Sequence, residues 1–521
     1  MAKQKKQIAI EESLWNTADK LRGSVEPAEY KYVVLGLFFL KYASDVFEQR
    51  QKEIIAEGHK EYLDISAFYT MKNVFYLVPE ARWSYLMKNA KQSDIALKVD
   101  NALHLIEKNN ESLKGALPDG YYTRLSLETT KLASLLDEID KIDTTKDPSH
   151  DIIGRVYEYF LQKFAIQEGR GKGEYYTPKC IVNLIAEMIQ PFKGRIYDPC
   201  CGSGGMFVQS MKFIDNHKGS RKEISVYGQE SITATLRLAK MNLAIRGISA
   251  NLGEKAVSTF TDDQHKNDKF DYIMANPPFN QKDWRGVNEL TDDLRWSGYA
   301  VPPVGNANYA WVLHMASKLS QNGVAGFLLA NGALSSMDIE YQIRRQLILN
   351  RLVEAIIILP RDLFYNTDSS VTFWILNRNK KTRAVENIDG IVQYRDRVDE
   401  ILFMDLRRWG AEYEKKFTQL TPEDIEKAST IFHNWQRKGF EKNYHNVPEL
   451  CYSAFIDEIE KKNYSLVPSK YIQFVDRDSD IDFDKEMERI QAEFAEILRE
   501  ETESQKEIKN AFKGLGYELK A

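Results

Sequence analysis

Apolar side chains recur at helical spacing through the first part of the chain. Leu14, Ala18 and Leu21 lie three or four residues apart, and the stretch from Val34 to Phe38 repeats the pattern after a Gly-Ser-Val-Glu-Pro break. Such intervals place side chains on one face of an α-helix. Further helical segments continue to about residue 140, so the pattern predicts a helical N-terminal domain over residues 1–145.

The pattern changes after a polar stretch at residues 143–151. Short apolar runs, each bounded by Gly, Pro or Asn, then alternate with segments of helix length. The runs read GRIYDP, ISVYGQE, FDYIMANPPF, GVAGFLLANG and LVEAIIILP. Alternation of this kind favours an α/β domain built around a mostly parallel sheet. We assign this second domain to residues 146–385.

Strand signals fade past Asn377, and charged residues become more frequent. The pattern predicts a mostly helical C-terminal region over residues 386–521, with one long surface helix at residues 482–513. The apolar side chains of this helix follow 3, 4, 3 spacing: Met487, Ile490, Phe494 and Ile497. Such a stripe fits either a solvated helix that packs on its own domain or a helix that docks on another chain.

Composition narrows the class of protein. The 521 residues suffice for about three domains at roughly 150 residues each. A hydrophobic fraction of 43% with 28% charged residues is an ordinary globular balance, which excludes wholesale disorder. The net charge of -5 argues against a protein that coats nucleic acid by charge alone, but it leaves room for a local basic cleft.

The cysteines and the apolar runs bear on location. Cys180, Cys200, Cys201 and Cys451 have neither the spacing of a disulfide framework nor a C-x-x-C pair, so we expect a reducing compartment and no metal site. No apolar run approaches the roughly 20 residues that span a bilayer, and the basic start of the chain lacks an apolar signal segment. We therefore expect a cytoplasmic protein without membrane contact.

A glycine-rich loop follows the first predicted strand of the α/β domain. It runs from Asp198 through Pro-Cys-Cys to Gly202, Ser203, Gly204 and Gly205. Glycines let the backbone turn sharply and approach a ligand too closely for any Cβ atom. The loop lacks the Gly-Lys-Ser/Thr of a P-loop and does not match G-x-G-x-x-G. It is typical of a nucleotide or cofactor loop, with a plain connecting turn as the alternative.

The next predicted strand ends in an acidic residue, Glu230. A carboxylate at the carboxyl end of a second strand can accept hydrogen bonds from both ribose hydroxyls of a nucleoside. A solvated surface carboxylate is the alternative. Together with the glycine-rich loop, Glu230 indicates a cofactor that contains adenosine.

The tetrapeptide Asn276-Pro277-Pro278-Phe279 follows another predicted strand. Two consecutive prolines cannot continue a sheet or enter a helix interior, so this segment should form a rigid edge at the carboxyl end of the sheet. It presents the Asn276 amide oxygen and a backbone carbonyl without amide donors at the prolines. Two such acceptors could hold an exocyclic amino group, and Phe279 offers a ring on which a base could stack. A bare turn is the alternative.

The loop DPCCGSGG followed by NPPF resembles the S-adenosylmethionine-dependent amino-methyltransferases of DNA. More narrowly, the chain resembles the modification subunits of type I restriction-modification systems. The resemblance extends over residues 13–378. Besides these two motifs, it rests on the segments SLWNTADKLRGSVEPAEYKYVVLGLFFLKY, GEYYTP, ANPPFNQKDW, GNANYAWVLHM, LANGALSS and LPRDLFYNT.

The resemblance implies a Rossmann-like methyltransferase sheet, with a helical N-terminal domain and a helical C-terminal extension. It implies S-adenosylmethionine as cofactor: the glycine-rich loop lines it, Glu230 holds the ribose, and the segment at 174–179 contacts the methionine part. The implied cofactor-binding residues are Glu174, Tyr175, Tyr176, Thr177, Pro178, Lys179, Asp198, Gly202, Ser203, Gly204, Gly205 and Glu230.

The resemblance also implies the reaction, which is methylation of the N6 amino group of adenine in a specific DNA sequence. The target adenine is flipped out of the duplex, and its amino group is gripped by Asn276 Oδ1 and the Pro277 carbonyl, with Pro278 and Phe279 completing the motif. Catalysis is then mainly positioning and electrostatic stabilisation, without a metal.

One position departs from the family pattern. Where the family often carries an acidic residue before Thr-Phe, this chain has Ser258. This puts one contact near an adenine in doubt. Asp262 and Asp263 lie close by in the sequence and are candidates to substitute.

No zinc finger, clear helix-turn-helix or large basic arm in the sequence would read base edges. We therefore expect a separate specificity subunit to read double-stranded DNA. The resemblance further implies a second copy of the modification subunit and a restriction subunit with motor and nuclease activities. The stripe from Met487 to Ile497 is the candidate docking helix.

Three other functions compete with this interpretation. The same scaffold could methylate N4 of cytosine, whose amino group would fit the NPPF segment equally well. The chain could instead bind the cofactor only to stabilise a restriction assembly, although Asn276 and Phe279 argue against this. A Rossmann dehydrogenase is disfavoured because the NPPF segment would have no task there.

Overall fold

The computed structural model describes residues 15, 27–125, 127–142, 152–168, 177–364, 371–388, 390–413, 416–475 and 483–514. The chain divides into two compact units, Met1–Ile472 and Gln473–Ala521. No helix within the described ranges combines the length and apolar character needed to cross a bilayer. Nor do these ranges contain three His, Cys, Asp or Glu side chains grouped so that they could hold a metal ion.

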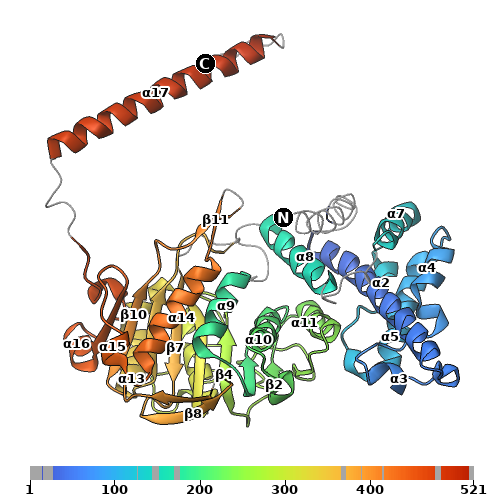
Figure 1. Cartoon of the computed structure of the whole chain (residues 1–521), viewed down its shortest axis with the longest axis horizontal. Helices are drawn as coiled ribbons and strands as arrows, with labels where there is room; N and C mark the ends of the chain where they lie inside the picture. The colour runs from blue at the N-terminus through green and yellow to red at the C-terminus, as the bar shows by residue number, and fades with distance from the viewer. Residues whose placement is uncertain are drawn as a thin grey trace. The chain divides into compact units, whose positions relative to one another are not determined.

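Helices make up the N-terminal part of the first unit, in agreement with the apolar spacing (Figure 1). They are α2 (Pro27–Ala56), α3 (Ala67–Thr70), α4 (Trp83–Asn89), α5 (Ile95–Asn109), α6 (Tyr121–Arg124), α7 (Thr129–Asp140) and α8 (Ile152–Glu168). Helix α2 begins at Pro27. Proline suits the first turn of a helix, because the amide hydrogen that it lacks would have no partner there in any case. From Val33 to Leu40 every apolar side chain is at most 2% exposed, so neighbours surround this helix.

The apolar core of these helices continues onto the α/β part of the chain. Leu238 and Met241 of α11 (Thr233–Ile245) belong to the same buried cluster as α2. The hydroxyl of Tyr157 in α8 donates a hydrogen bond of 2.9 Å to the Leu238 carbonyl. Apolar packing is therefore continuous between the two domains expected on either side of residue 145. The domain boundary itself stays a prediction.

Within the described residues, nine strands form the central sheet, in the order β13-β10-β6-β7-β5-β4-β1-β2-β3. They are β1 (Gly194–Asp198), β2 (Ile224–Gly228), β3 (Ala250–Asn251), β4 (Phe270–Ala275), β5 (Leu319–Ala330), β6 (Val353–Ile358), β7 (Val371–Asn377), β10 (Glu400–Asp405) and β13 (Cys451–Phe455). Strands β7 and β13 are antiparallel to their neighbours, and the other strand pairs are parallel. This mostly parallel sheet confirms the α/β fold predicted from the alternating pattern.

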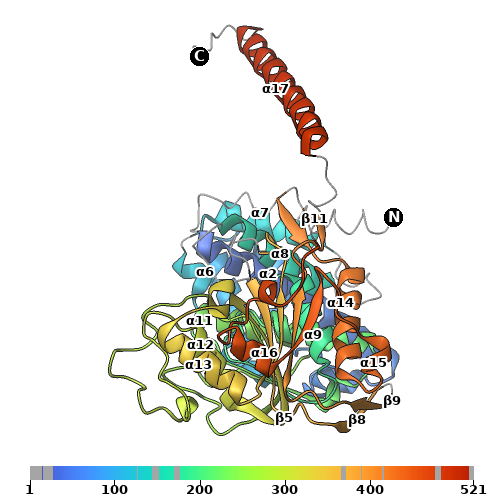
Figure 2. The same ribbon diagram turned by 90° about the vertical axis from the view of Figure 1, so that its left-hand side faces the viewer.

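Helices cover both faces of the sheet (Figure 2). One buried cluster joins the sheet to α9 (Lys179–Ile189), α10 (Gly205–Asn216) and α14 (Pro422–Gln436), and another joins it to α12 (Asn308–Lys318) and α13 (Asp338–Leu349). Because both faces are covered, central strands such as β6 are buried along their whole length. This burial explains why the strands appear in the sequence as continuous apolar runs.

The sheet extends further along the chain than the sequence pattern predicts. Strands β10 and β13 lie past Asn377, where strand signals were expected to fade, and they widen the sheet beyond β6. Strand β10 is only six residues long and is buried throughout, so it shows neither alternation nor helical spacing. The remaining elements of this region are β8 (Arg383–Asn387), β9 (Gly390–Tyr394), β11 (Ala411–Tyr413), β12 (Phe417–Gln419), α15 (Phe440–Asn443) and α16 (Ile456–Lys461).

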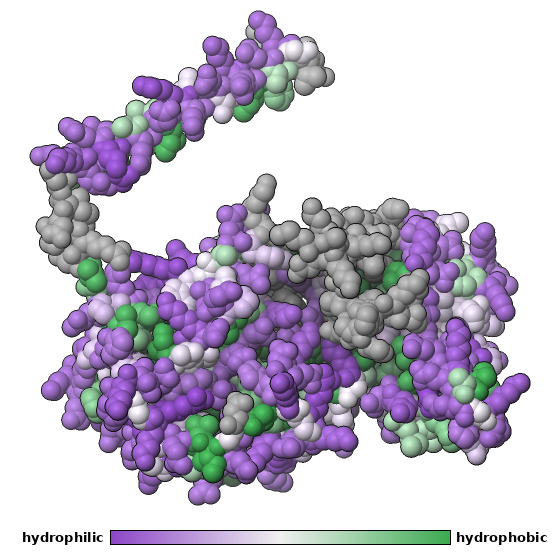
Figure 3. Space-filling model, in the orientation of Figure 1, coloured by the Kyte–Doolittle hydropathy of each residue, from purple (hydrophilic) through white to green (hydrophobic). Residues whose placement is uncertain are grey.

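The second unit consists mainly of α17 (Phe483–Gly514), a helix of 32 residues that matches the predicted bounds closely. None of its residues is buried. The stripe residues are exposed by 37% at Met487, 45% at Ile490, 60% at Phe494 and 59% at Ile497. Figure 3 shows apolar patches along this otherwise polar helix.

Candidate active site

Three neighbouring parallel strands bring the predicted site segments to one edge of the sheet. Strand β1 lies between β2 and β4, with Asp198 opposite Gly228 at the end of β2. Glu230 follows β2 by two residues, and Asn276 comes directly after β4. Because the carboxyl ends of parallel strands meet at one edge, segments far apart in the sequence lie together there.

The glycine-rich loop has open space beside two of its glycines. Gly202 and Gly204 have φ angles of +53° and +81°, in the left-handed region that favours glycine. A Cβ atom at Gly202 or Gly205 would meet no other atom within 4 Å. The carbonyl of Ser203 accepts a 2.7 Å hydrogen bond from the Asn242 side chain, which anchors the loop to α11. The loop is therefore anchored to α11, and the space beside Gly202 and Gly205 is unfilled.

Glu230 ties the glycine-rich loop to the turn after β2. Its Oε2 atom accepts a hydrogen bond of 3.0 Å from the Gly202 amide. Its Oε1 atom accepts from the amides of Ser231 and Ile232, at 2.7 and 2.9 Å. A carboxylate oxygen has two lone pairs, so Oε2 retains the capacity to accept a second hydrogen bond.

Burial changes the charge that the loop carries. It raises the pKa of Asp198 to about 7, an effect that the hydrogen bonds from Cys200 oppose and the nearby Glu230 carboxylate reinforces. Burial also raises the pKa values of the Cys200 and Cys201 thiols well above the ordinary 9.0. These thiols stay protonated at neutral pH, as expected of packing residues rather than nucleophiles.

The NPPF segment presents an unpaired acceptor. Asn276 is only 8% exposed, and its Nδ2 atom donates a 2.9 Å hydrogen bond to the Thr177 hydroxyl. Its Oδ1 atom is buried and has no hydrogen-bond partner in the described part of the chain. Pro277 and Pro278 lack amide hydrogens, so the adjoining backbone offers acceptors only. The Phe279 ring lies edge-on to Phe364, with ring centres 6.1 Å apart.

The segment expected to contact the methionine part of the cofactor is described only at its end. Glu174, Tyr175 and Tyr176 lie outside the described residues. Pro178 is the residue that precedes α9, and Lys179 is the first residue of that helix. Thr177 reaches the site through its hydrogen bond with Asn276.

The segment Val257-Ser258-Thr259-Phe260 lies against the glycine-rich loop and the turn after β2. The Val257 amide donates a 3.0 Å hydrogen bond to the Glu230 carbonyl, and the Thr259 hydroxyl donates one of 2.5 Å to the Pro199 carbonyl. Sequence reasoning singled out Ser258 here but missed Thr259. In the sequence, Thr259 is marked only by the aromatic Phe260 beside it. A polar residue next to an aromatic one is too common to indicate a site.

The two aspartates considered as substitutes for the missing acidic residue are engaged elsewhere. Asp263 forms an ion pair of 2.6 Å with Lys318, a lysine whose side chain is only 3% exposed. Asp262 pairs with Lys255 at 2.9 Å on the surface. Both aspartates are thus ion-paired in this structure, and their role as substitutes for the missing carboxylate stays a prediction.

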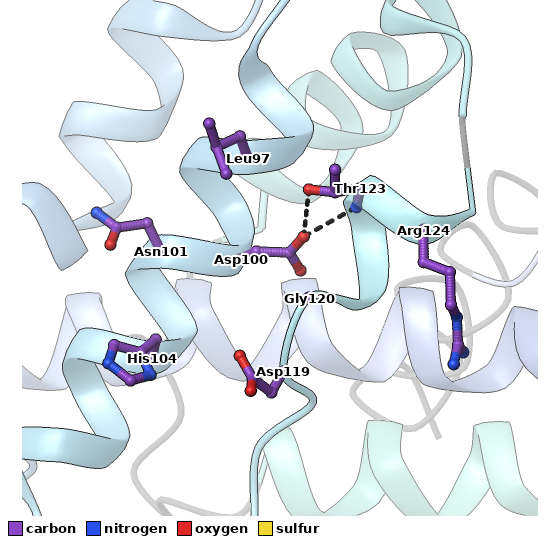
Figure 4. A pocket seen from close by; sticks show the side chains of 8 residues that line it. All are labelled: Leu97, Asp100, Asn101, His104, Asp119, Gly120, Thr123 and Arg124. Carbon is purple, nitrogen blue, oxygen red and sulfur yellow. Dashed lines mark hydrogen bonds between the residues drawn. The ribbon is translucent and has the colours of Figure 1, made fainter.

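A separate pocket of about 530 Å³ lies among the N-terminal helices. Figure 4 shows the Asp100 carboxylate in this pocket turned toward Thr123. It accepts hydrogen bonds from the Thr123 amide and hydroxyl, at 2.8 and 2.6 Å. The same carboxylate also accepts from the Tyr122 amide at 2.9 Å. These bonds hold the first turn of α6, so Asp100 has a structural role, and no predicted site residue lines this pocket.

Comparisons with known proteins agree with the site. Residues 148–480 match the family described as N-6 DNA Methylase, and residues 10–139 match the HsdM N-terminal domain. The type I restriction enzyme HindI methylase subunit of Haemophilus influenzae is 40% identical over 441 residues, which cover 82% of this chain and 94% of that protein. The MjaIX methylase subunit of Methanocaldococcus jannaschii is 34% identical, over 98% of this chain and 92% of its own length.

A solved structure confirms the fold. It is the type I restriction-modification system methyltransferase subunit from Streptococcus thermophilus, with a TM-score of 0.72 at 23% identity. The match covers 90% of this chain and 100% of that one. The family matches and the two relatives confirm the resemblance derived from the motifs. The chain therefore belongs to the N-6 DNA methylases and, among them, to the methylase subunits of type I restriction enzymes.

Proposed function

We propose that this chain transfers a methyl group from S-adenosylmethionine to N6 of adenine in double-stranded DNA, as the modification subunit of a type I restriction-modification complex. The observation that carries the proposal is the buried Oδ1 atom of Asn276, which has no hydrogen-bond partner among the described residues. A buried acceptor without a donor is costly unless a ligand supplies one. An exocyclic amino group supplies such a donor.

The residues at the sheet edge fit the proposed cofactor. The space in front of Gly202 and Gly205 admits a ligand close to the backbone. The remaining lone pair of Glu230 Oε2 can accept a ribose hydroxyl. We assign the methionine part to the segment around Thr177 and Lys179. The bound cofactor supplies a methyl group on a sulfonium, which is reactive enough that the protein need not provide a metal.

The NPPF segment would prepare the amino group of the flipped base for reaction. Asn276 Oδ1 and the Pro277 carbonyl accept its two hydrogens, which draws them to one side and leaves the nitrogen lone pair directed to the other. Phe279 offers its ring for stacking on the base, and stacking offsets part of the cost of unstacking it from the duplex. The chain thus supplies orientation and acceptors, and the surplus proton leaves from a cationic nitrogen without a strong base.

Product analysis tests this function. The chain is purified with its specificity subunit and incubated with methyl-labelled S-adenosylmethionine and unmethylated DNA, and the DNA is then digested to nucleosides. We expect the label in N6-methyladenine. Label in N4-methylcytosine would instead support the cytosine alternative, and cofactor binding without any label would support a purely structural subunit.

We also propose that α17 docks on a helix of the specificity subunit. Residues 473–521 form a unit distinct from the one that contains the sheet, and within the expected C-terminal region we assign the docking role to this unit. Spacing of three and four residues is the pattern that packs one helix against another. The exposed stripe therefore suits a partner helix, and a second modification subunit could then join the same specificity subunit.

Removing the residues after Asp478 should abolish co-elution with the specificity subunit on a sizing column. The double substitution Ile490→Glu and Phe494→Glu should do the same, because it places two charges in the centre of the apolar stripe. The exposed Glu496→Ala on the other side of the helix is the matched control and should leave the complex intact. Recovery of the full complex by the truncated chain would remove the docking role.

A further inference from the structure

The hydrogen bond between Thr177 and Asn276 joins residues that are 99 positions apart in the chain. Thr177 lies two residues before the start of α9, and the buried Pro178 that follows restricts its backbone. Asn276 lies at the end of β4 and is 8% exposed. The bond therefore links the segment assigned to the cofactor with the residue assigned to the target base.

We infer that Thr177 is a positioning residue for methyl transfer: its hydroxyl oxygen accepts the Asn276 Nδ2 hydrogen and thereby holds Oδ1 toward the amino group of the target. This inference rests on the proposed function and adds a residue to it. Neither end of a side-chain amide can be buried cheaply without a partner. With Oδ1 directed at the base, Nδ2 faces away from it, and Thr177 is the acceptor found there.

Without the Thr177 hydroxyl, the productive orientation of Asn276 would leave Nδ2 as a buried donor with no acceptor. Turning the amide over would then place an N–H group against the amino hydrogens of the base, where an acceptor is needed. Either arrangement raises the barrier to methyl transfer. Loss of the hydroxyl should therefore lower the rate of the bound complex, even if the affinity for the cofactor does not change.

A cofactor contact and a positioning role for Thr177 predict different results. A direct contact with the methionine part would appear mainly in the KM and Kd for S-adenosylmethionine. Positioning of Asn276 would appear in kcat, and the effect would disappear when Asn276 is already truncated, because the residue through which Thr177 acts is then absent.

The test measures kcat and the cofactor Kd of the complex with the specificity subunit for Thr177→Val, Thr177→Ser, Asn276→Ala and the double variant. We expect Thr177→Val, which keeps the shape but lacks the hydroxyl, to lower kcat about 10- to 100-fold. Thr177→Ser, which keeps the hydroxyl, should stay within about threefold of the wild type. In the Asn276→Ala background, Thr177→Val should lower kcat no further.

Cofactor binding by each variant shows that it is folded. The inference is overturned if Thr177→Val weakens cofactor binding and leaves kcat unchanged, or if its effect on kcat is equally large in both backgrounds. Failure of the proposed function would appear differently, as wild-type protein without N6-methyladenine product or as full activity in Asn276→Ala.

Discussion

Asn276→Ala should lower kcat for methyl transfer by about 10²- to 10³-fold, the range found when one preorganised group at a reacting centre is removed. The substitution deletes the Oδ1 acceptor, which no described residue occupies, and leaves the amino group with the Pro277 carbonyl alone. Because the acceptor acts on the target base, the Kd for S-adenosylmethionine should stay within about twofold of the wild-type value.

The matched control for this prediction is Asn322→Ala. Asn322 is exposed and lies near the amino end of the part of β5 that pairs with β4, which is the sheet edge opposite the site. We expect it to leave both kcat and cofactor binding unchanged. A single-turnover assay with labelled cofactor separates methyl transfer from product release. Unchanged turnover in Asn276→Ala would contradict the role assigned to the NPPF segment.

Arg397→Met should lower the free energy of unfolding of the first unit by about 3–5 kcal/mol, the range typical for breaking a buried ion pair. The Arg397 Nε atom lies 2.5 Å from Glu354 Oε1, and both side chains are 0% exposed. Glu354 also accepts hydrogen bonds from Asn377 at 2.6 Å and from Gln436 at 3.1 Å. Without the guanidinium, the Glu354 carboxylate would lose its ion-pair partner and keep only these neutral donors and the more distant charge of Lys380.

The loss of stability in Arg397→Met should depend on pH in a defined direction. Burial alone would raise the pKa of Glu354, but Arg397, Asn377 and Lys380 hold it below the ordinary value of 4.5. In Arg397→Met the folded-state pKa should instead lie above that value, so the variant loses stability as the pH rises from 4.5 through its new pKa. The difference from the wild type should therefore shrink as the pH falls from 8 toward 4.5.

Chemical denaturation at several pH values measures this difference. The matched control is Arg397→Met combined with Glu354→Gln, which removes the unpaired charge and keeps the amide close to Asn377 and Gln436. We expect the double variant to recover most of the lost stability. A loss that is the same at every pH, or no recovery in the double variant, would contradict the charge argument.

The local patterns were enough to predict the elements that carry the site. The glycine-rich loop, Glu230 and the NPPF segment each follow a short buried strand, and the parallel sheet brings their ends to one edge, as the alternating pattern implies. The family that these motifs indicate is confirmed by the comparisons. The roles of the individual site residues stay predictions.

Two features could not be predicted because they depend on long-range packing. Strand β10 carries the run Ile401 to Met404, which has no alternation because both of its faces are covered. The pairing of Arg397 with Glu354 joins β6 to the turn before β10, and nothing in the local sequence of either residue indicates the other. The bond from Asn276 to Thr177 is similar, since its ends meet only when α9 packs against the sheet.

If α17 docks as proposed, its helical order depends on assembly with the partner. Most of the stability of a helix in a protein comes from packing of its apolar face, and none of the 32 residues of α17 is buried in this chain. Part of the energy gained on docking would therefore be used to hold these residues helical. Subunit affinity and local helicity then become one linked equilibrium, which depends on the concentration of the partner.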